Sequence, residues 1–215
     1  MRILLADDHE IVRRGLQMVL SLEKDFEVVG EASSGAEAVA RAKELRPDLV
    51  LMDLKMRTMD GAAATRMIKH AQPETRVLIL TGIEADEEIM HALEAGADGY
   101  VLKEVSPDEL IRAIRVIGAG EAYLQPTVTK NLIRKMHATP ARAEATSQHP
   151  ALTARECEIL RLMATSATYR EIAAQLVVSE ETIRSHTKNI LAKLGQPNRT
   201  QAVMLALREG LVDLD

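Results

Sequence analysis

Five short apolar runs recur at nearly regular intervals in the first half of the chain, and helical patterns separate them. The runs begin near residues 2, 26, 48, 76 and 99 and read RILLAD, FEVVGEA, DLVLMD, RVLILTG and GYVLKE. Between them, apolar residues recur at the spacing of one helix face. Strands and helices that alternate in this way form parallel strands joined by crossover helices. The sequence therefore predicts an α/β, doubly wound, five-stranded parallel sheet.

The rest of the chain divides into a connecting segment and a helical unit. In TVTKNLIRKMH, Pro126 suits a first helical turn, and Val128, Leu132 and Met136 share a face, which predicts a short helix. The segment 138–150 has no periodicity and indicates a tether. Helical patterns follow at about 153–164, 168–176, 179–194 and 199–209. We therefore expect a first domain at 1–121, a linker with a short helix at 122–149, and an all-α, four-helix domain at 150–215.

Composition excludes several classes of protein. With 47% hydrophobic and 27% charged residues, the chain is globular rather than disordered. No eighteen apolar residues follow one another and no export segment is evident, so we expect a cytoplasmic protein without a membrane partner. The single cysteine, Cys157, excludes an internal disulfide and a cysteine-based metal site.

Charged and hydroxyl side chains follow four of the predicted strands. Asp7 and Asp8 follow the first strand, Asp53 ends the third, Thr81 ends the fourth and Lys103 ends the fifth. The carboxyl ends of parallel strands lie along one edge of the sheet, where such sheets bind ligands. Carboxylates gathered there repel one another unless a divalent cation or an ammonium compensates. The pattern suits Mg²⁺, with Asp53 as a phosphoryl acceptor and with Thr81 and Lys103 contacting the transferred group.

Each of these residues also has an ordinary explanation, since strand-end Asp often caps a turn and Lys is usually solvated. Two enzyme classes deserve comparison. A phosphatase of the haloacid dehalogenase type normally has a second Asp two residues after the nucleophile, where this chain has Lys55. A flavin-binding flavodoxin-like domain needs a loop that accepts phosphate, whereas Asp7 and Asp8 repel it. Both enzyme classes therefore fit less well than a non-enzymatic phosphoacceptor.

Four segments of the first domain carry a family resemblance. LLADDHEIVRRGL, MDLKMRTMDG, LTG and GYVLK resemble the receiver domain of bacterial response regulators, over essentially residues 1–121. The resemblance implies a flavodoxin-like receiver that a sensor histidine kinase phosphorylates on Asp53. It also implies a Mg²⁺ site formed by Asp7, Asp8, Asp53 and the backbone carbonyl of Lys55. It further implies a conformational switch that involves Thr81, Lys103 and Tyr100.

Two features of this domain qualify the resemblance. The family usually has Pro four residues after the phosphorylated Asp, and here the residue is Arg57. The change frees the backbone φ and adds a cation beside the acidic site, so we expect a more mobile loop and an altered phosphate lifetime. Tyr100 matches an aromatic that changes rotamer in the family, although a half-buried strand tyrosine is an equal interpretation.

Residues 168–194 have the pattern of two helices joined by a turn. On the second helix, Ile183, Thr187 and Ile190 fall on one side. The opposite side is cationic and small, which suits a helix in the DNA major groove. The predicted base contacts are Arg184, Ser185 and Lys188, and the predicted phosphate contacts are Thr168, Arg170, Thr182, Lys193 and Arg199. An ordinary solvated face, or a surface that recognises protein, explains the same pattern.

A second resemblance favours DNA. LTARECEILRLMA, REIAAQL, SEETIRSHTKNILAKLG and RTQAV look like the LuxR-type helix-turn-helix module of NarL/FixJ regulators, over about residues 150–213. It implies the base contacts given above and dimerisation through Val203, Ala206 and Leu207. Three residues depart from the family pattern, in which Gly, Gly and Asn are common: Ser166, Val177 and Tyr169. A β-branched residue resists positive φ, which puts the helix-turn-helix angle and the preferred DNA sequence in doubt.

Together, the two resemblances imply a two-component response regulator. We expect a transcription factor that is not an enzyme, binds Mg²⁺ and double-stranded DNA, and forms a homodimer when phosphorylated or bound to DNA. Phosphorylation of Asp53 by a sensor histidine kinase would control it. A regulator of the same fold that binds DNA independently of phosphorylation is the alternative.

Overall fold

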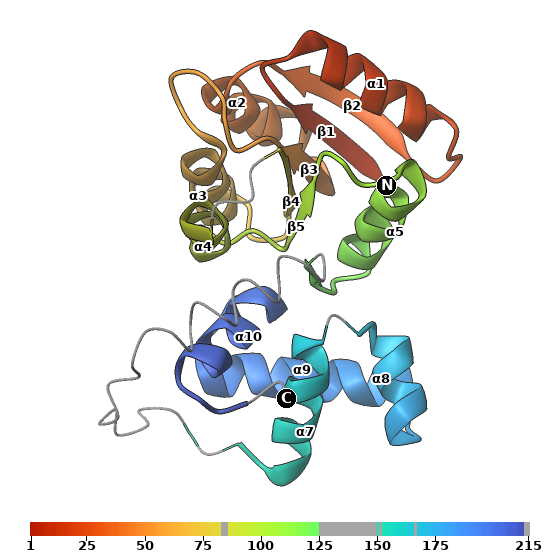
Figure 1. Ribbon diagram of the computed structural model, residues 1–215, viewed down its shortest axis with the longest axis vertical. Coiled ribbons are helices and arrows are strands. Elements are labelled where there is room, and N and C mark those ends of the chain that lie inside the picture. Colours follow the sequence, from red (N-terminus) through yellow and green to blue (C-terminus); the bar gives the residue numbers. More distant parts are fainter. Residues whose placement is uncertain (83–85, 125–149, 151, 166, 213–215) are drawn as a thin grey trace. The chain divides into compact units, whose positions relative to one another are not determined.

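The computed structural model describes residues 1–82, 86–124, 150, 152–165 and 167–212. The chain forms two compact units, Met1–Tyr123 and Leu124–Asp215 (Figure 1). The predicted linker helix with Val128, Leu132 and Met136 lies outside the described residues, as does Ser166. Among the helices that are described, none has the length and apolar character needed to cross a membrane.

The first unit is built on a sheet with the strand order β2-β1-β3-β4-β5-β6. The strands are β1 (Arg2–Ala6), β2 (Glu27–Ala32), β3 (Leu49–Met52), β4 (Arg76–Thr81), β5 (Gly99–Leu102) and β6 (Tyr123–Leu124). Strands β1 to β5 pair in parallel, which confirms the predicted five-stranded sheet. The sixth strand was not predicted, because two residues are too few to show a periodicity.

Five helices cover the two faces of this sheet, α1 and α5 on one face and α2, α3 and α4 on the other (Figure 1). They are α1 (Glu10–Ser21), α2 (Gly35–Leu45), α3 (Gly61–Ala71), α4 (Asp86–Glu94) and α5 (Pro107–Gly118). Side-chain caps begin three of them: Ser34, Asp60 and Ser106 each accept a hydrogen bond from a backbone N–H of the first helical turn. The caps define where the loops end and therefore where the strand-end residues lie.

The central strands are buried on both faces. Leu49, Val50, Leu51 and Met52 of β3 are all at most 1% exposed. One face packs against α1 and α5 in a cluster that includes Ile3, Leu5, Leu49, Leu51, Leu78, Leu80, Val101, Ile114 and Ile117. Because β3 has no solvated face, the polar chain that follows it emerges only at the edge of the sheet.

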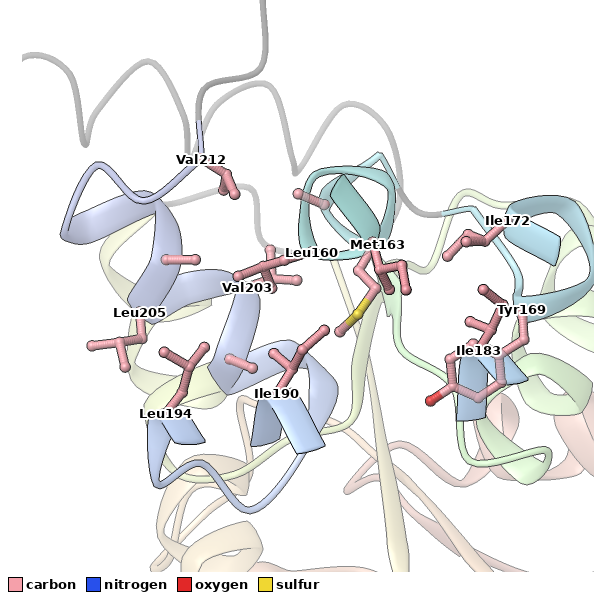
Figure 2. Packing of buried hydrophobic residues seen from close by; sticks show 14 of the residues in the cluster. Leu160, Met163, Tyr169, Ile172, Ile183, Ile190, Leu194, Val203, Leu205 and Val212 are labelled. Atoms are coloured by element: carbon pink, nitrogen blue, oxygen red, sulfur yellow. The ribbon is translucent and has the colours of Figure 1, made fainter. Parts of the chain in front are cut away.

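The second unit contains four described helices. They are α7 (Ala154–Ala164), α8 (Tyr169–Leu176), α9 (Glu180–Leu194) and α10 (Arg199–Arg208). Thr153 and Thr168 form capping boxes with Glu156 and Glu171, and Ser179 caps α9. Buried side chains from all four helices form one core, which Figure 2 shows around Leu160, Met163, Ile172, Ile183, Ile190 and Val203.

The turn between α8 and α9 contains a strained residue. Val177 has φ +54° and ψ +47°, ends α8 in the left-handed conformation, and is 90% exposed. A β-branched residue is rarely found there, since the Cβ lies too close to the carbonyl oxygen. The turn is therefore made by a β-branched residue rather than by a glycine.

Candidate functional site

Three polar side chains meet where β1, β3 and β5 end. The backbone N–H of Asp53 donates to the carbonyl of Ala6, which places the two strand ends side by side. The Lys103 ammonium lies 2.6 Å from Oδ2 of Asp7 and 3.0 Å from Oδ2 of Asp53. The side chains of both carboxylates are nearly inaccessible, 3% and 4% exposed. Lys103 is 96 positions from Asp7 and 50 positions from Asp53 in the sequence, and the fold brings all three into one buried cluster.

A glycine allows the start of α3 to pack closely against Asp53. Gly61 is the first residue of α3, and its backbone N–H donates to the carbonyl of Leu54 over 2.9 Å. A Cβ at this position would lie 2.1 Å from the carbonyl oxygen of Asp53. Real Cβ atoms do not approach backbone that closely, so α3 can begin against Asp53 only because residue 61 is glycine.

The electrostatics of the cluster leave it with excess negative charge. Burial raises the pKa of Asp53 above its ordinary value, and the charge of Asp7 adds to the rise, although hydrogen bonds from Lys103 and Thr81 oppose it. Burial lowers the pKa of Lys103, but hydrogen bonds to Asp7 and Asp53 outweigh it, so the net shift is upward and the ammonium is retained. One cation thus faces two buried carboxylates, which favours the binding of a further cation.

Two further residues, Asp8 and His9, complete a set of four candidate metal ligands. Ligand atoms of Asp7, Asp8, His9 and Asp53 all lie within 4.8 Å of one another. Oδ1 of Asp8 is buried and accepts no hydrogen bond from the described residues, although Nδ1 of His9 lies 2.9 Å from it. Three carboxylates with an unsatisfied oxygen fit Mg²⁺, a hard ion that takes oxygen ligands. Sequence reasoning missed His9, whose only signal was its place directly after the two acids.

The loop after β3 brings additional charges to the rim of the cluster. Nε of Arg57 lies 3.8 Å from Oδ2 of Asp8, and Nζ of Lys55 lies 3.7 Å from Oε1 of Glu88 on α4. Beside them is an open cleft of about 530 Å³, lined by Asp8, Leu54, Lys55, Met56, Arg57, Asp60, Ala62, Glu88 and His91. The loop turns tightly at Thr58, where φ is +68° and the N–H of the next residue donates to the carbonyl of Arg57. Arg57 therefore places a cation at the acidic site, as its position predicts.

The other two candidate switch residues, besides Lys103, lie inside the first unit. Thr81, at the end of β4, is 1% exposed and Tyr100 in β5 is fully buried. The half-buried tyrosine considered from the sequence is thus a fully buried one. Its change of rotamer and the metal contact of the Lys55 carbonyl stay predictions.

Helix α9 presents the predicted base-contacting residues on its outer side. Ile183, Thr187, Ile190 and Leu194 are buried against the core. On the other side Ser185 and Lys188 are exposed, and Arg184 is half-buried. Among the predicted phosphate contacts, Arg170 is exposed, whereas Thr168 and Thr182 are half-buried.

Two predicted phosphate contacts are not free surface cations. Arg199 is 3% exposed, and its guanidinium donates to the carbonyls of Met163 and Ala167. The prediction of a phosphate-contacting surface cation was therefore wrong for Arg199, because its side chain is buried where it bonds to the carbonyls of Met163 and Ala167. Lys193 is partly exposed, but its ammonium lies 2.7 Å from Oε2 of Glu156, a buried carboxylate.

The predicted dimer residues also lie differently from expectation. Val203 is 3% exposed, Ala206 is fully buried, and both belong to the core, while Leu207 packs partly buried against it. The prediction of a dimer surface was wrong for Val203 and Ala206, because the apolar stripe of α10 covers the core of its own unit.

Comparison with known proteins now places both units. Residues 3–115 match the model of the response regulator receiver domain, and residues 150–206 match that of the bacterial regulatory proteins of the luxR family. The chain belongs to the luxR-type response regulators. This is a family of DNA-binding transcription regulators rather than enzymes.

Relatives and solved structures match this regulator over nearly its whole length. The response regulator protein VraR of Staphylococcus aureus is 43% identical over 211 residues, which is 98% of each chain. The crystal structure of the response regulator ChrA, from a heme-sensing two-component system, is 36% identical, covers 98% of both chains and has a TM-score of 0.54. A structure of two RcsB dimers bound to two parallel DNAs is 27% identical, covers 97% of this chain and 98% of that one, and has a TM-score of 0.57. The regulator thus shares a two-unit architecture with other response regulators.

Proposed function

We propose that a sensor histidine kinase phosphorylates Asp53 of this regulator and that the phosphoryl group controls its binding to double-stranded DNA. The observation that carries the proposal is the convergence of Asp7, Asp53 and Lys103 at one buried edge of the sheet. A carboxylate held between a second carboxylate and an ammonium is suited to accept a phosphoryl group when a divalent cation neutralises the excess charge.

In this proposal Asp7, Asp8, Asp53 and the backbone carbonyl of Lys55 hold Mg²⁺. The ion, when bound, neutralises charge on the transferred group. An oxygen of Asp53 attacks the phosphorus, the bond to the donor breaks, and the donor leaves with the bonding electron pair. Lys103 pairs with the new phosphoryl oxygens and Thr81 donates a hydrogen bond to them. Their inward movement, with a change at Tyr100, biases the first unit between two arrangements.

The DNA interface of the proposal is the outer side of α9. Arg184, Ser185 and Lys188 would contact base edges, and Arg170, Thr168 and Thr182 would contact phosphates from neighbouring segments. The exposure of Ser185, Lys188 and Arg170 supports this assignment. The RcsB structure is described as dimers on DNA. We propose likewise that this regulator binds DNA as a homodimer, whose two-fold symmetry would set the half-site spacing.

The test is to measure DNA affinity in two phosphorylation states. The full chain is used to select duplexes from random sequence, and the affinity for a selected duplex is measured at fixed salt with Mg²⁺, with and without acetyl phosphate. The proposal predicts a gain in affinity with acetyl phosphate that Asp53→Asn abolishes. Equal affinity in both states would contradict phosphorylation control and leave a phosphorylation-independent DNA-binding regulator. No binding to any duplex would contradict the DNA interface.

A further inference from the structure

The ring of Tyr169 lies beneath two guanidinium groups in the second unit. Cζ of Arg184 is 4.9 Å from the ring centroid, and Cζ of Arg199 is 5.4 Å from it. Both distances are within the range in which the negative face of an aromatic ring attracts a cation. The ring is therefore shared by a residue of α9 and the first residue of α10.

Tyr169 cannot readily move to follow Arg184. It is the first residue of α8, between the two capping-box residues Thr168 and Glu171, and it is 4% exposed. Its ring belongs to the same buried cluster as Ile172 and Ile183 (Figure 2). A capped helix start and a packed core thus hold the ring in one place.

The second guanidinium is also fixed. Arg199 donates to the carbonyl of Met163 at the end of α7 and to the carbonyl of Ala167 in the loop before α8. Those two bonds tie Arg199 to the segment that leads into Tyr169. The ring that Arg184 packs on therefore belongs to α8 and also contacts Arg199 of α10, which is itself bonded to the end of α7.

Among the three predicted base contacts, Arg184 is the one whose side chain is half-buried rather than exposed. It precedes Ser185 and lies one helical turn before Lys188, both of which are exposed. Bidentate contact with a guanine edge needs the guanidinium in one plane and at one place, whereas a long arginine side chain in solvent samples many rotamers. Packing on a fixed ring reduces that freedom before DNA arrives.

We propose that Tyr169 is a positioning residue for DNA recognition, which holds the guanidinium of Arg184 in place on the outer side of α9. This inference rests on the proposed DNA-binding function. The resemblance to LuxR-type modules gives asparagine as the usual residue at this position, so the ring is a departure from that pattern. Tyr169 acts through Arg184, so its loss weakens binding to the preferred sequence more than binding to unrelated DNA.

The test is a double-mutant cycle in the full chain, with a selected duplex and a scrambled duplex of the same length at fixed salt. Tyr169→Leu keeps an apolar side chain but removes the ring face, and we expect roughly two- to ten-fold lower affinity for the selected duplex. Affinity for the scrambled duplex should change less than two-fold. In the Arg184→Ala background, Tyr169→Leu should lower the affinity no further. The single variant Tyr169→Phe, which keeps the ring, should bind like the wild type.

Two controls separate positioning from loss of stability. Ile190→Val shortens a fully buried side chain of the same core and should leave both affinities unchanged. Without DNA, the Arg184 side-chain Nε–H resonance should show a ring-current shift in the wild type and in Tyr169→Phe, and should lose it in Tyr169→Leu.

The possible failures are distinguishable. Suppose that the wild type binds the selected duplex. If Tyr169→Leu binds it equally well, or if Tyr169→Leu lowers the affinity by the same factor with and without Arg184→Ala, the inference is overturned and the proposed function stands. An equal loss in Ile190→Val would also overturn it. If the wild type binds no duplex, the proposed function fails and the inference fails with it.

Discussion

The two units each bury a charged cluster, and the clusters differ in how their charge is balanced. In the first unit, the Lys103 ammonium serves both Asp7 and Asp53. In the second, the Lys193 ammonium lies 2.7 Å from the buried carboxylate of Glu156, and Glu156 also accepts hydrogen bonds from the backbone N–H and the hydroxyl of Thr153. The side chains of Lys103 and Lys193 are similarly exposed, 24% and 29%, so exposure of the lysine does not explain why the two clusters differ in charge balance.

The pKa directions follow the charge balance. Burial and the charge of Asp7 leave the pKa of Asp53 raised. Burial also raises the pKa of Glu156, but the hydrogen bonds from Lys193 and Thr153 outweigh it, and the net shift is downward. A balanced cluster supports the fold, whereas a cluster with excess charge costs stability and is suited to bind something of opposite sign.

The largest expected effect comes from removing each lysine. Lys103→Met leaves two buried carboxylates without their cation, and we expect the first unit to lose about 2–4 kcal/mol of unfolding free energy. Lys193→Met leaves Glu156 with its bonds from Thr153, and we expect a loss of about 1 kcal/mol. Urea unfolding with EDTA, followed by domain-specific probes, measures both losses. Mg²⁺ should restore part of the loss in Lys103→Met only; equal losses without rescue would remove the distinction between the clusters.

Neutralising one carboxylate in each cluster should change stability in opposite directions. Without Mg²⁺, Asp53→Asn relieves repulsion with Asp7 and should stabilise the first unit by about 1 kcal/mol. Glu156→Gln weakens the bond from Lys193 and should destabilise the second unit by about 1 kcal/mol. Chemical denaturation of the two variants beside the wild type provides the measurement. A shift of the same sign in both units would contradict the charge balance described here.

Acidification should distinguish the clusters in the same way. Glu156 has a folded-state pKa below its ordinary 4.5, so its stabilisation is present above that value and is lost as pH falls through the folded pKa. Asp53 has a folded-state pKa above its ordinary 3.8. Its protonation therefore stabilises the folded state fully below pH 3.8, and this stabilisation is lost as the pH rises through the folded-state pKa. Unfolding free energies measured against pH in EDTA should show these opposite slopes, and Glu156→Gln and Asp53→Asn should each flatten one of them.

The smallest expected effect concerns backbone strain. Val177 in the second unit and Arg46 in the first both end a helix with positive φ, +54° and +46°. Val177→Gly should stabilise its unit by about 0.5–1 kcal/mol, since relief of the left-handed strain exceeds the added chain entropy. Arg46→Gly should give less, because its side chain is not β-branched. Thermal unfolding of both variants checks this, and an equal or larger gain at Arg46 would show that β-branching is not the cause.

The sequence was sufficient for the sheet and for most of the acidic cluster. Parallel strands that are buried on both faces leave polar residues only at their ends, so Asp7, Asp53 and Lys103 could be brought together by topology alone. His9 could not be predicted in the same way, because strand periodicity does not determine where a loop side chain points.

The second unit was harder to predict in its details. The helical wheel placed Ile183 and Ile190 inside correctly, since periodicity determines which side of a helix is apolar. Periodicity does not say what that side covers, and Val203 and Ala206 proved to be core rather than dimer surface. The burial of Arg199 depends on carbonyls at Met163 and Ala167, which only the tertiary fold brings near.

The excess negative charge of the first cluster is tested most directly by a Mg²⁺ titration of the full chain, followed by amide NMR resonances. We expect saturable shifts at Asp7, Asp8, Asp53 and Lys55, none around Glu156, and no saturation in Asp8→Asn. Resonances of both clusters that respond alike, or first-unit resonances that do not respond, would contradict the account.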